Sequence, residues 1–100
     1  MYDMKKLQKF SKLAELAPTA FQAFVAFDKA AVLPGAISVK HKELIAVAVA
    51  LTTQCPYCID IHARKAREAG ATEQEFAEVT LVTAALRAGG AMTHGTHALE

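Results

Sequence analysis

The chain has 100 residues, a length that favours one small domain covering residues 1–100. Apolar residues make up 53% and charged residues 21%, the formal net charge is +1, and no basic face for nucleic acid is evident. The longest apolar run, Leu44 to Leu51, is far shorter than the roughly 20 residues that cross a bilayer, and the N-terminus lacks a signal-peptide pattern. We therefore expect a cytoplasmic protein with no nucleic-acid or membrane partner.

Hydrophobic residues recur with a helical period along the chain, and no convincing strand alternation is present. This pattern predicts an all-α fold of about five or six helices. The first helix is expected from about Met4 to Ala17 and the second from about Thr19 to Val32, with Pro18 at the junction. The second helix has a bulky face that favours core or subunit-interface packing, formed by Phe21, Phe24, Val25 and Phe27.

The third helix is expected from about Val39 to Thr53, with Ser38 as its N-cap. Its later part is apolar on nearly every face, so this helix should be central in the fold. Glu43 stands at the edge of that apolar part and can point to the same side as Val47 and Ala50.

The fourth helix is expected from about Pro56 to Ala69, followed by Gly70 as its C-cap glycine. Thr72 and Glu75 have the spacing of a capping box, which predicts the start of a fifth helix. Gly89-Gly90 is expected to stop that helix, and residues 91–100 to form a short helix or to fray.

The candidate chemistry lies between the third and fourth helices, where the only two cysteines of the chain occur. Cys55 and Cys58 have the spacing of a redox dithiol or of half a metal site. Pro56 suits the first helical position, so Cys55 should begin the helix and Cys58 should lie in its first turn. The unpaired N–H groups and the helix dipole favour a thiolate there. His62 follows Cys58 by four residues and shares its face of the helix.

Three interpretations of the cysteine pair are open. In the first, one thiolate attacks an oxidised substrate and the other cysteine resolves the product as a disulfide. In the second, Cys55, Cys58 and His62 bind zinc, with Glu43 as a further ligand, although the second Cys/His pair of a structural zinc site is absent from the sequence. In the third, both cysteines simply pack, which their position at a helix start beside a histidine argues against. We favour the redox dithiol.

Several other side chains are candidates for supporting roles. His62 could deprotonate a thiol, and Glu43 could orient His62 or take its proton if their two helices pack together. Tyr57, between the cysteines, could donate a hydrogen bond to a peroxide or carbonyl oxygen, or could cover the disulfide. The sequence identifies no partner and no role for His41, His94 and His97.

Taken together, these residues resemble a known family. Glu43, the Cys55-Pro56-Tyr57-Cys58 motif and His62, followed by Gly70 and the capping box, are similar to the AhpD-like alkylhydroperoxidase branch of the carboxymuconolactone decarboxylase family. The resemblance covers the chain from about Ala17 to Gly90. It implies an AhpD-like helical single domain packed as an oligomer, with the dithiol at the start of a helix.

The resemblance also implies residue roles. Cys58 resembles the cysteine that attacks the peroxide and becomes a sulfenic acid, and Cys55 resembles the partner that closes the redox-active disulfide. His62 and Glu43 resemble the catalytic proton relay. Some relatives have a histidine where this chain has Tyr57, so a relay role at that position does not carry over. Neither a cofactor nor a metal is implied.

The expected function is that of a thiol-dependent peroxidase of the peroxiredoxin type, acting on hydrogen peroxide or organic hydroperoxides. Its reductant would be a thioredoxin-like or lipoyl-bearing protein, and the expected assembly is a homo-oligomer, with a hexamer favoured. One alternative is a carboxymuconolactone decarboxylase-type lyase with His62 as acid and base. Another is a non-enzymatic redox or metal-binding oligomer. The lactone decarboxylases of the family typically lack the cysteine pair, so its presence favours the redox branch.

Overall fold

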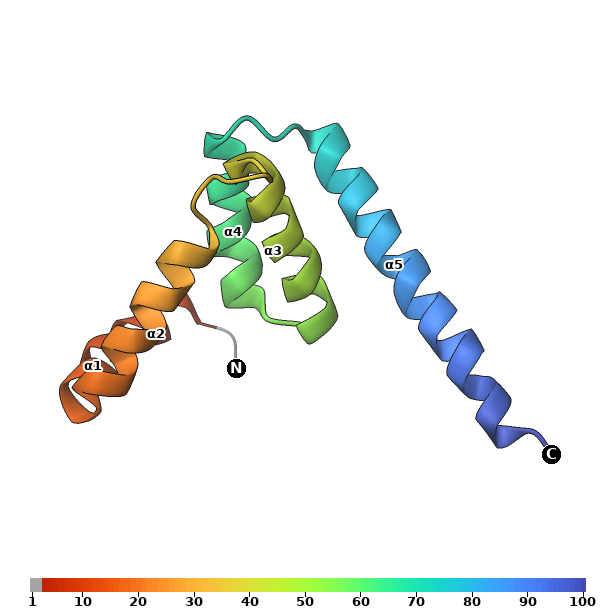
Figure 1. Cartoon of the computed structure of the whole chain (residues 1–100), viewed down its shortest axis with the longest axis horizontal. Coiled ribbons are helices and arrows are strands. Elements are labelled where there is room, and N and C mark those ends of the chain that lie inside the picture. The colour runs from red at the N-terminus through yellow and green to blue at the C-terminus, as the bar shows by residue number, and fades with distance from the viewer. Residues whose placement is uncertain (1–2) are drawn as a thin grey trace. The chain divides into compact units, whose positions relative to one another are not determined.

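The computed structural model describes residues 3–100, which form five α-helices and two 3-10 helices (Figure 1). No strand occurs in this part of the chain, which confirms the expected all-α class. The chain divides into two compact units, one ending at Val39 and the other comprising Lys40–Glu100. Among the residues described, no helix combines the length and apolar character that a membrane span requires.

The segment expected as one helix from about Met4 to Ala17 consists of two elements, η1 (Met4–Lys9) and α1 (Phe10–Leu16). The carbonyl of Asp3 accepts a hydrogen bond from the N–H of Lys6 at 2.9 Å. This spacing of three residues is typical of a 3-10 helix. The first turns are therefore wound more tightly than the hydrophobic pattern alone predicts.

The helix α2 (Pro18–Ala31) follows α1 after a single intervening residue. Pro18 occupies the first helical position, where its missing N–H is harmless. Ala17, with φ −139° and ψ 65°, breaks the helical conformation between the two helices. The rings of Phe10 and Phe21 pack against each other across the turn, with centroids 6.1 Å apart.

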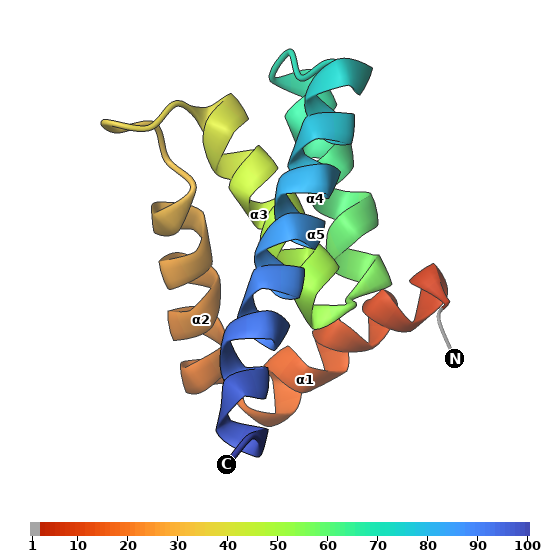
Figure 2. The same ribbon diagram turned by 90° about the vertical axis from the view of Figure 1, so that its right-hand side faces the viewer.

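The second unit contains α3 (Val39–Thr53) from its second residue, α4 (Pro56–Glu68), α5 (Glu73–Gly95) and η2 (Thr96–Ala98). The helices α3 and α4 run antiparallel and side by side in both views (Figures 1 and 2). The buried apolar side chains of this unit are Leu44, Val47 and Ala50 of α3 and Ala66 of α4. Three of these four side chains belong to α3, so this helix carries most of the buried apolar surface of the unit.

The ends of α4 and α5 follow the sequence signals closely. Gly70 has a φ of +100°, which suits glycine, and its N–H bonds the carbonyl of Arg67 in the turn that ends α4. At the start of α5, the Thr72 side chain accepts from the N–H of Glu75 at 3.1 Å. The Glu75 carboxylate accepts from the N–H of Thr72 at 2.9 Å, which confirms the capping box.

The expected end of the fifth helix at Gly89-Gly90 is wrong, because α5 continues without a break to Gly95. A glycine lowers helix propensity by about 1 kcal/mol relative to alanine, but it keeps its N–H and fits the helical backbone. No proline follows the pair, and Ala91 and Met92 are good helix formers. The glycines therefore weaken this part of the helix without ending it.

Candidate active site

The site begins at the turn between α3 and α4. Gln54 has a left-handed backbone, with a φ of 56°, at the position after a helix that glycine usually occupies. This conformation lets the N–H of Cys55 bond the carbonyl of Ala50 at 3.1 Å, which satisfies one of the last carbonyls of α3. Only Gln54 and Cys55 separate the end of α3 from the start of α4.

Cys55 is the N-cap of α4, with Pro56 at the first helical position, as the sequence predicts. The Sγ of Cys55 accepts a hydrogen bond from the N–H of Cys58 at 3.3 Å. The two Sγ atoms lie 2.6 Å apart, and the two cysteines are not joined by a disulfide bond. The helix start therefore places both sulfurs within reach of a disulfide bond.

The surroundings of Cys55 favour its thiolate. Hydrogen bonding from the Cys58 side chain, and then from the Cys58 N–H, lowers the pKa of the Cys55 thiol below its ordinary value. Burial acts in the opposite direction and is a smaller effect, while the backbone of Tyr57 adds to the lowering. These hydrogen bonds at the helix start thus stabilise a negative charge on Cys55.

A carboxylate and an imidazole form a pair next to the pocket that contains Cys58. Glu43 of α3 and His62 of α4 are in contact, with Oε2 and Nδ1 2.6 Å apart. The Glu43 side chain is only 3% exposed and that of His62 is 20% exposed. When Glu43 is ionised it accepts a hydrogen bond from Nδ1–H, which leaves Nε2 of His62 as the proton acceptor. The sequence places these two residues nineteen positions apart, and the antiparallel packing of α3 and α4 brings them together.

Cys58 and His62 share one pocket of about 270 Å³. The wall opposite them belongs to α3 and consists of Ala46, Val49, Ala50 and Thr53. The pocket therefore offers a sulfur and an imidazole to a ligand, beside a wall that is apolar except for Thr53, whose hydroxyl bonds the carbonyl of Ala50.

The remaining sequence candidates lie apart from this pocket. Tyr57 is half-buried and does not line the pocket. His41 is on α3, beside α5. His94 and His97 lie near the end of the chain, with ring centroids 5.7 Å apart. Within residues 3–100, no group of three or more His, Cys, Asp or Glu side chains is arranged to hold a metal ion.

Sequence reasoning missed two features of the site. Val49 and Thr53 line the pocket, and their spacing of four residues on an apolar helix was the available signal. Gln54 gave no such signal, because glutamine is not typical of left-handed turns. The only indication of a left-handed residue at Gln54 was that the chain must turn between the helix ending at Thr53 and the helix starting at Pro56.

The chain matches a family profile and is similar to a curated protein. The sequence profile described as the Carboxymuconolactone decarboxylase family matches residues 18–100. A protein of Paracoccus denitrificans, described as uncharacterized protein 4 in the cox locus, is 47% identical over 75 residues, which are 75% of this chain and 68% of that protein.

Two solved structures are also similar to this chain. A protein from Methanobacterium thermoautotrophicum matches 88% of this chain and 99% of its own, with a TM-score of 0.81 and 35% identity. A carboxymuconolactone decarboxylase family protein from Legionella pneumophila, crystallised in the apo form, matches 95% of this chain and 85% of its own. Its TM-score is 0.78 and its identity is 29%.

Proposed function

Because the chain belongs to the carboxymuconolactone decarboxylase family, we propose that it is a thiol-dependent peroxidase that reduces hydrogen peroxide or organic hydroperoxides. The main support is one observation: a dithiol lies beside a buried carboxylate–imidazole pair, and both groups reach the same pocket. A dithiol can give the two electrons that reduction of an O–O bond needs. The carboxylate–imidazole pair can move the protons.

The proposed reaction has two covalent steps. First, the Cys58 thiolate attacks a peroxide oxygen, so that an S–O bond forms while the O–O bond breaks. The departing oxygen takes a proton and leaves as alcohol or water, and Cys58 becomes a sulfenic acid. Second, the Cys55 thiolate attacks the Cys58 sulfur, an S–S bond forms, and hydroxide leaves as water after taking a proton.

The contact between Glu43 and His62 supports a proton route for the first step. Nε2 of neutral His62 can accept the proton of the Cys58 thiol, and the resulting imidazolium is stabilised by the Glu43 carboxylate. The same proton is then available to the departing oxygen of the peroxide. Burial of Glu43 strengthens this pairing, because little water competes with it.

The lowered pKa of Cys55 suits the second step of the proposal. A lowered pKa raises the fraction of Cys55 present as thiolate, which is the form that attacks a sulfenic acid. Return to the dithiol then requires two electrons from an external dithiol. We assign that part to a thioredoxin-like or lipoyl-bearing protein.

The decisive experiment is peroxide consumption at neutral pH with excess dithiol, comparing the native protein with two serine variants. Cys58→Ser should lose turnover entirely, because no sulfur remains to attack the peroxide. After one equivalent of peroxide without added dithiol, Cys55→Ser should stop at the Cys58 sulfenic acid, because the chain has no second thiol to resolve it. Undiminished turnover in Cys58→Ser would contradict the proposal.

A second candidate is a lyase that decarboxylates a lactone acid, which the family description favours. In that case His62 would act as acid and base, and the cysteines would be incidental. Decarboxylation that survives replacement of both cysteines, but not His62→Gln, would select the lyase.

A further inference from the structure

The pocket that contains Cys58 and His62, which we refer to as the Cys58 pocket, also has a hydroxyl group on its wall. That hydroxyl belongs to Thr53, the last residue of α3. The other wall residues on α3 are alanines and a valine. Among the described residues that line the pocket, Thr53 is thus the one that adds a polar group to the sulfur and the imidazole. A polar group in an otherwise apolar wall is suited to fix the orientation of a bound molecule.

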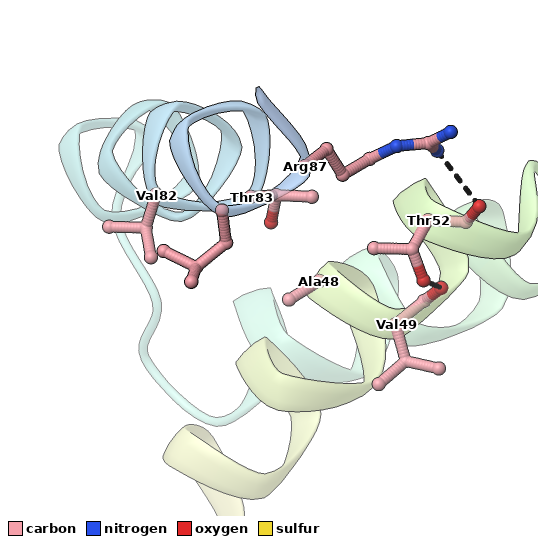
Figure 3. A pocket seen from close by; sticks show the side chains of 7 residues that line it. Ala48, Val49, Thr52, Val82, Thr83 and Arg87 are labelled. Carbon is pink, nitrogen blue, oxygen red and sulfur yellow. Dashed lines mark hydrogen bonds between the residues drawn. The ribbon is translucent and has the colours of Figure 1, made fainter. Parts of the chain in front are cut away.

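Thr52 and Thr53 are neighbours at the end of α3, but their hydroxyl groups have different surroundings. Thr52 lies outside the Cys58 pocket and lines a hollow between α3 and α5 (Figure 3). Its hydroxyl donates to the carbonyl of Val49 at 2.6 Å, a short hydrogen bond. The Thr53 hydroxyl donates to the carbonyl of Ala50 at 3.4 Å, beyond the roughly 3.0 Å that is usual for an O–H donor. The Thr53 hydroxyl is therefore weakly held and can turn towards a molecule in the pocket.

The carbonyl of Ala50 does not depend on Thr53 for a hydrogen bond. The N–H of Cys55 also donates to this carbonyl, at 3.1 Å, in the turn that leads to α4. When the Thr53 hydroxyl turns away, the carbonyl keeps a donor, so the cost of releasing the hydroxyl is small. For the same reason, a variant without this hydroxyl should keep the hydrogen bond of the turn before the dithiol.

We propose that the Thr53 hydroxyl binds the peroxide and donates a hydrogen bond to its departing oxygen while the Cys58 thiolate attacks the other oxygen. This role rests on the proposed peroxidase function. Negative charge builds up on the departing oxygen as the S–O bond forms and the O–O bond breaks. A hydrogen bond to that oxygen therefore becomes stronger in the transition state than in the bound peroxide. The proton that the departing oxygen takes up still comes from His62, and Thr53 is unchanged at the end of the step.

The test uses the Cys55→Ser chain, in which Cys58 is the only thiol and each chain reduces one peroxide. Serine is also a good N-cap, so the start of α4 should be retained. The measurement is the second-order rate constant for consumption of hydrogen peroxide without added dithiol. Adding Thr53→Val should lower this constant about tenfold or more, because valine has a similar shape but cannot donate a hydrogen bond. Adding Thr53→Ser should retain most of the rate.

Thr52→Val is the matched control, because it removes a hydroxyl from the neighbouring residue of the same helix outside the Cys58 pocket. It should leave the rate constant for peroxide unchanged. Alkylation of Cys58 by iodoacetamide is a second readout, since it needs the thiolate but breaks no O–O bond. The pH profile of alkylation should be the same with Thr53→Val as without it.

The outcomes separate the role of Thr53 from the peroxidase function. If the Cys55→Ser chain with Thr53 intact is alkylated but consumes no peroxide, the peroxidase function is refuted, and the role of Thr53 with it. If that chain consumes peroxide and Thr53→Val does not slow the reaction, only the role of Thr53 is refuted. Equal slowing of peroxide consumption and alkylation by Thr53→Val would also overturn it, because the hydroxyl would then act on the thiol and not on the peroxide.

Discussion

Gln54 has a left-handed backbone at the point where α3 ends and the dithiol begins. A non-glycine residue pays about 1 kcal/mol or more for this conformation, whereas glycine adopts it freely. Glycine is also more flexible in the unfolded chain, which offsets part of the gain. We therefore predict that Gln54→Gly raises the free energy of unfolding by about 0.5 kcal/mol, measured by urea denaturation.

The same substitution at Gln74 serves as the matched control. Gln74 is in the first turn of α5, where the backbone is an ordinary right-handed helix. Gln74→Gly should lower the free energy of unfolding by about 0.5–1 kcal/mol. If both variants changed stability in the same direction, the argument from the backbone of Gln54 would be wrong.

The role of the Glu43 charge beside His62 can be tested with a single substitution. Glu43→Gln keeps the size and the hydrogen bond to His62 but removes the negative charge beside the imidazole. We predict that peroxide turnover falls about ten- to hundredfold, because the imidazolium loses its stabilising partner. The measurement is the rate with excess dithiol, with circular dichroism to verify that helix content is retained. Glu68→Gln, on the exposed last turn of α4, should leave the rate unchanged.

At the scale of elements, Glu75 links the start of α5 to α3. Its carboxylate caps the N–H of Thr72 and lies 2.9 Å from the ammonium of Lys40. The hydrogen bond from Lys40, followed by that from the Thr72 backbone, lowers the pKa of Glu75. A lowered pKa in the folded state means that Glu75 stabilises the fold at neutral pH. That contribution is lost as the pH falls through the folded-state pKa.

We therefore predict that the melting temperature of the native protein falls on acidification below the ordinary glutamate pKa of 4.5, because the unfolded chain then takes up a proton at Glu75 more readily than the folded chain. Glu75→Gln should melt at a lower temperature at pH 7 and should lose less on acidification. Thermal melts at pH 7 and pH 3.5 give both values. Glu68→Gln is again the control, and an equal reduction of the pH effect in that variant would refute the assignment to Glu75.

The helix ends show what could be read from the sequence and what could not. Cys55 as N-cap, Gly70 after α4 and the Thr72–Glu75 capping box follow from local chemistry, and each was predictable. The contact between Glu43 and His62 needed one further assumption, that two neighbouring helices pack antiparallel. Gly89-Gly90 misled the prediction because glycine weakens a helix without preventing it.

At the scale of the whole molecule, the last part of α5 is exposed along its whole length. Every residue from 84 to 100 is exposed, including Leu86 at 69% and Met92 at 77%. This segment also contains Gly89 and Gly90, so its intrinsic helix propensity is low. A side chain added at either glycine would meet no other atom within 4 Å. A helix of this kind is normally stabilised by packing against another surface, and the glycines would permit a close approach.

We propose that a second copy of the chain provides that surface, in keeping with the homo-oligomer expected from the sequence. The native protein should then have a mass in light scattering that is a multiple of the 10.7 kDa chain. Met92→Glu should shift the mass towards that of one chain, because it places a charge on an apolar surface that association would bury. Gln74→Glu adds the same charge in the first turn of α5 and should leave the mass unchanged. A native protein that runs as a single chain would refute the proposal, and α5 would then have to be stable without a partner.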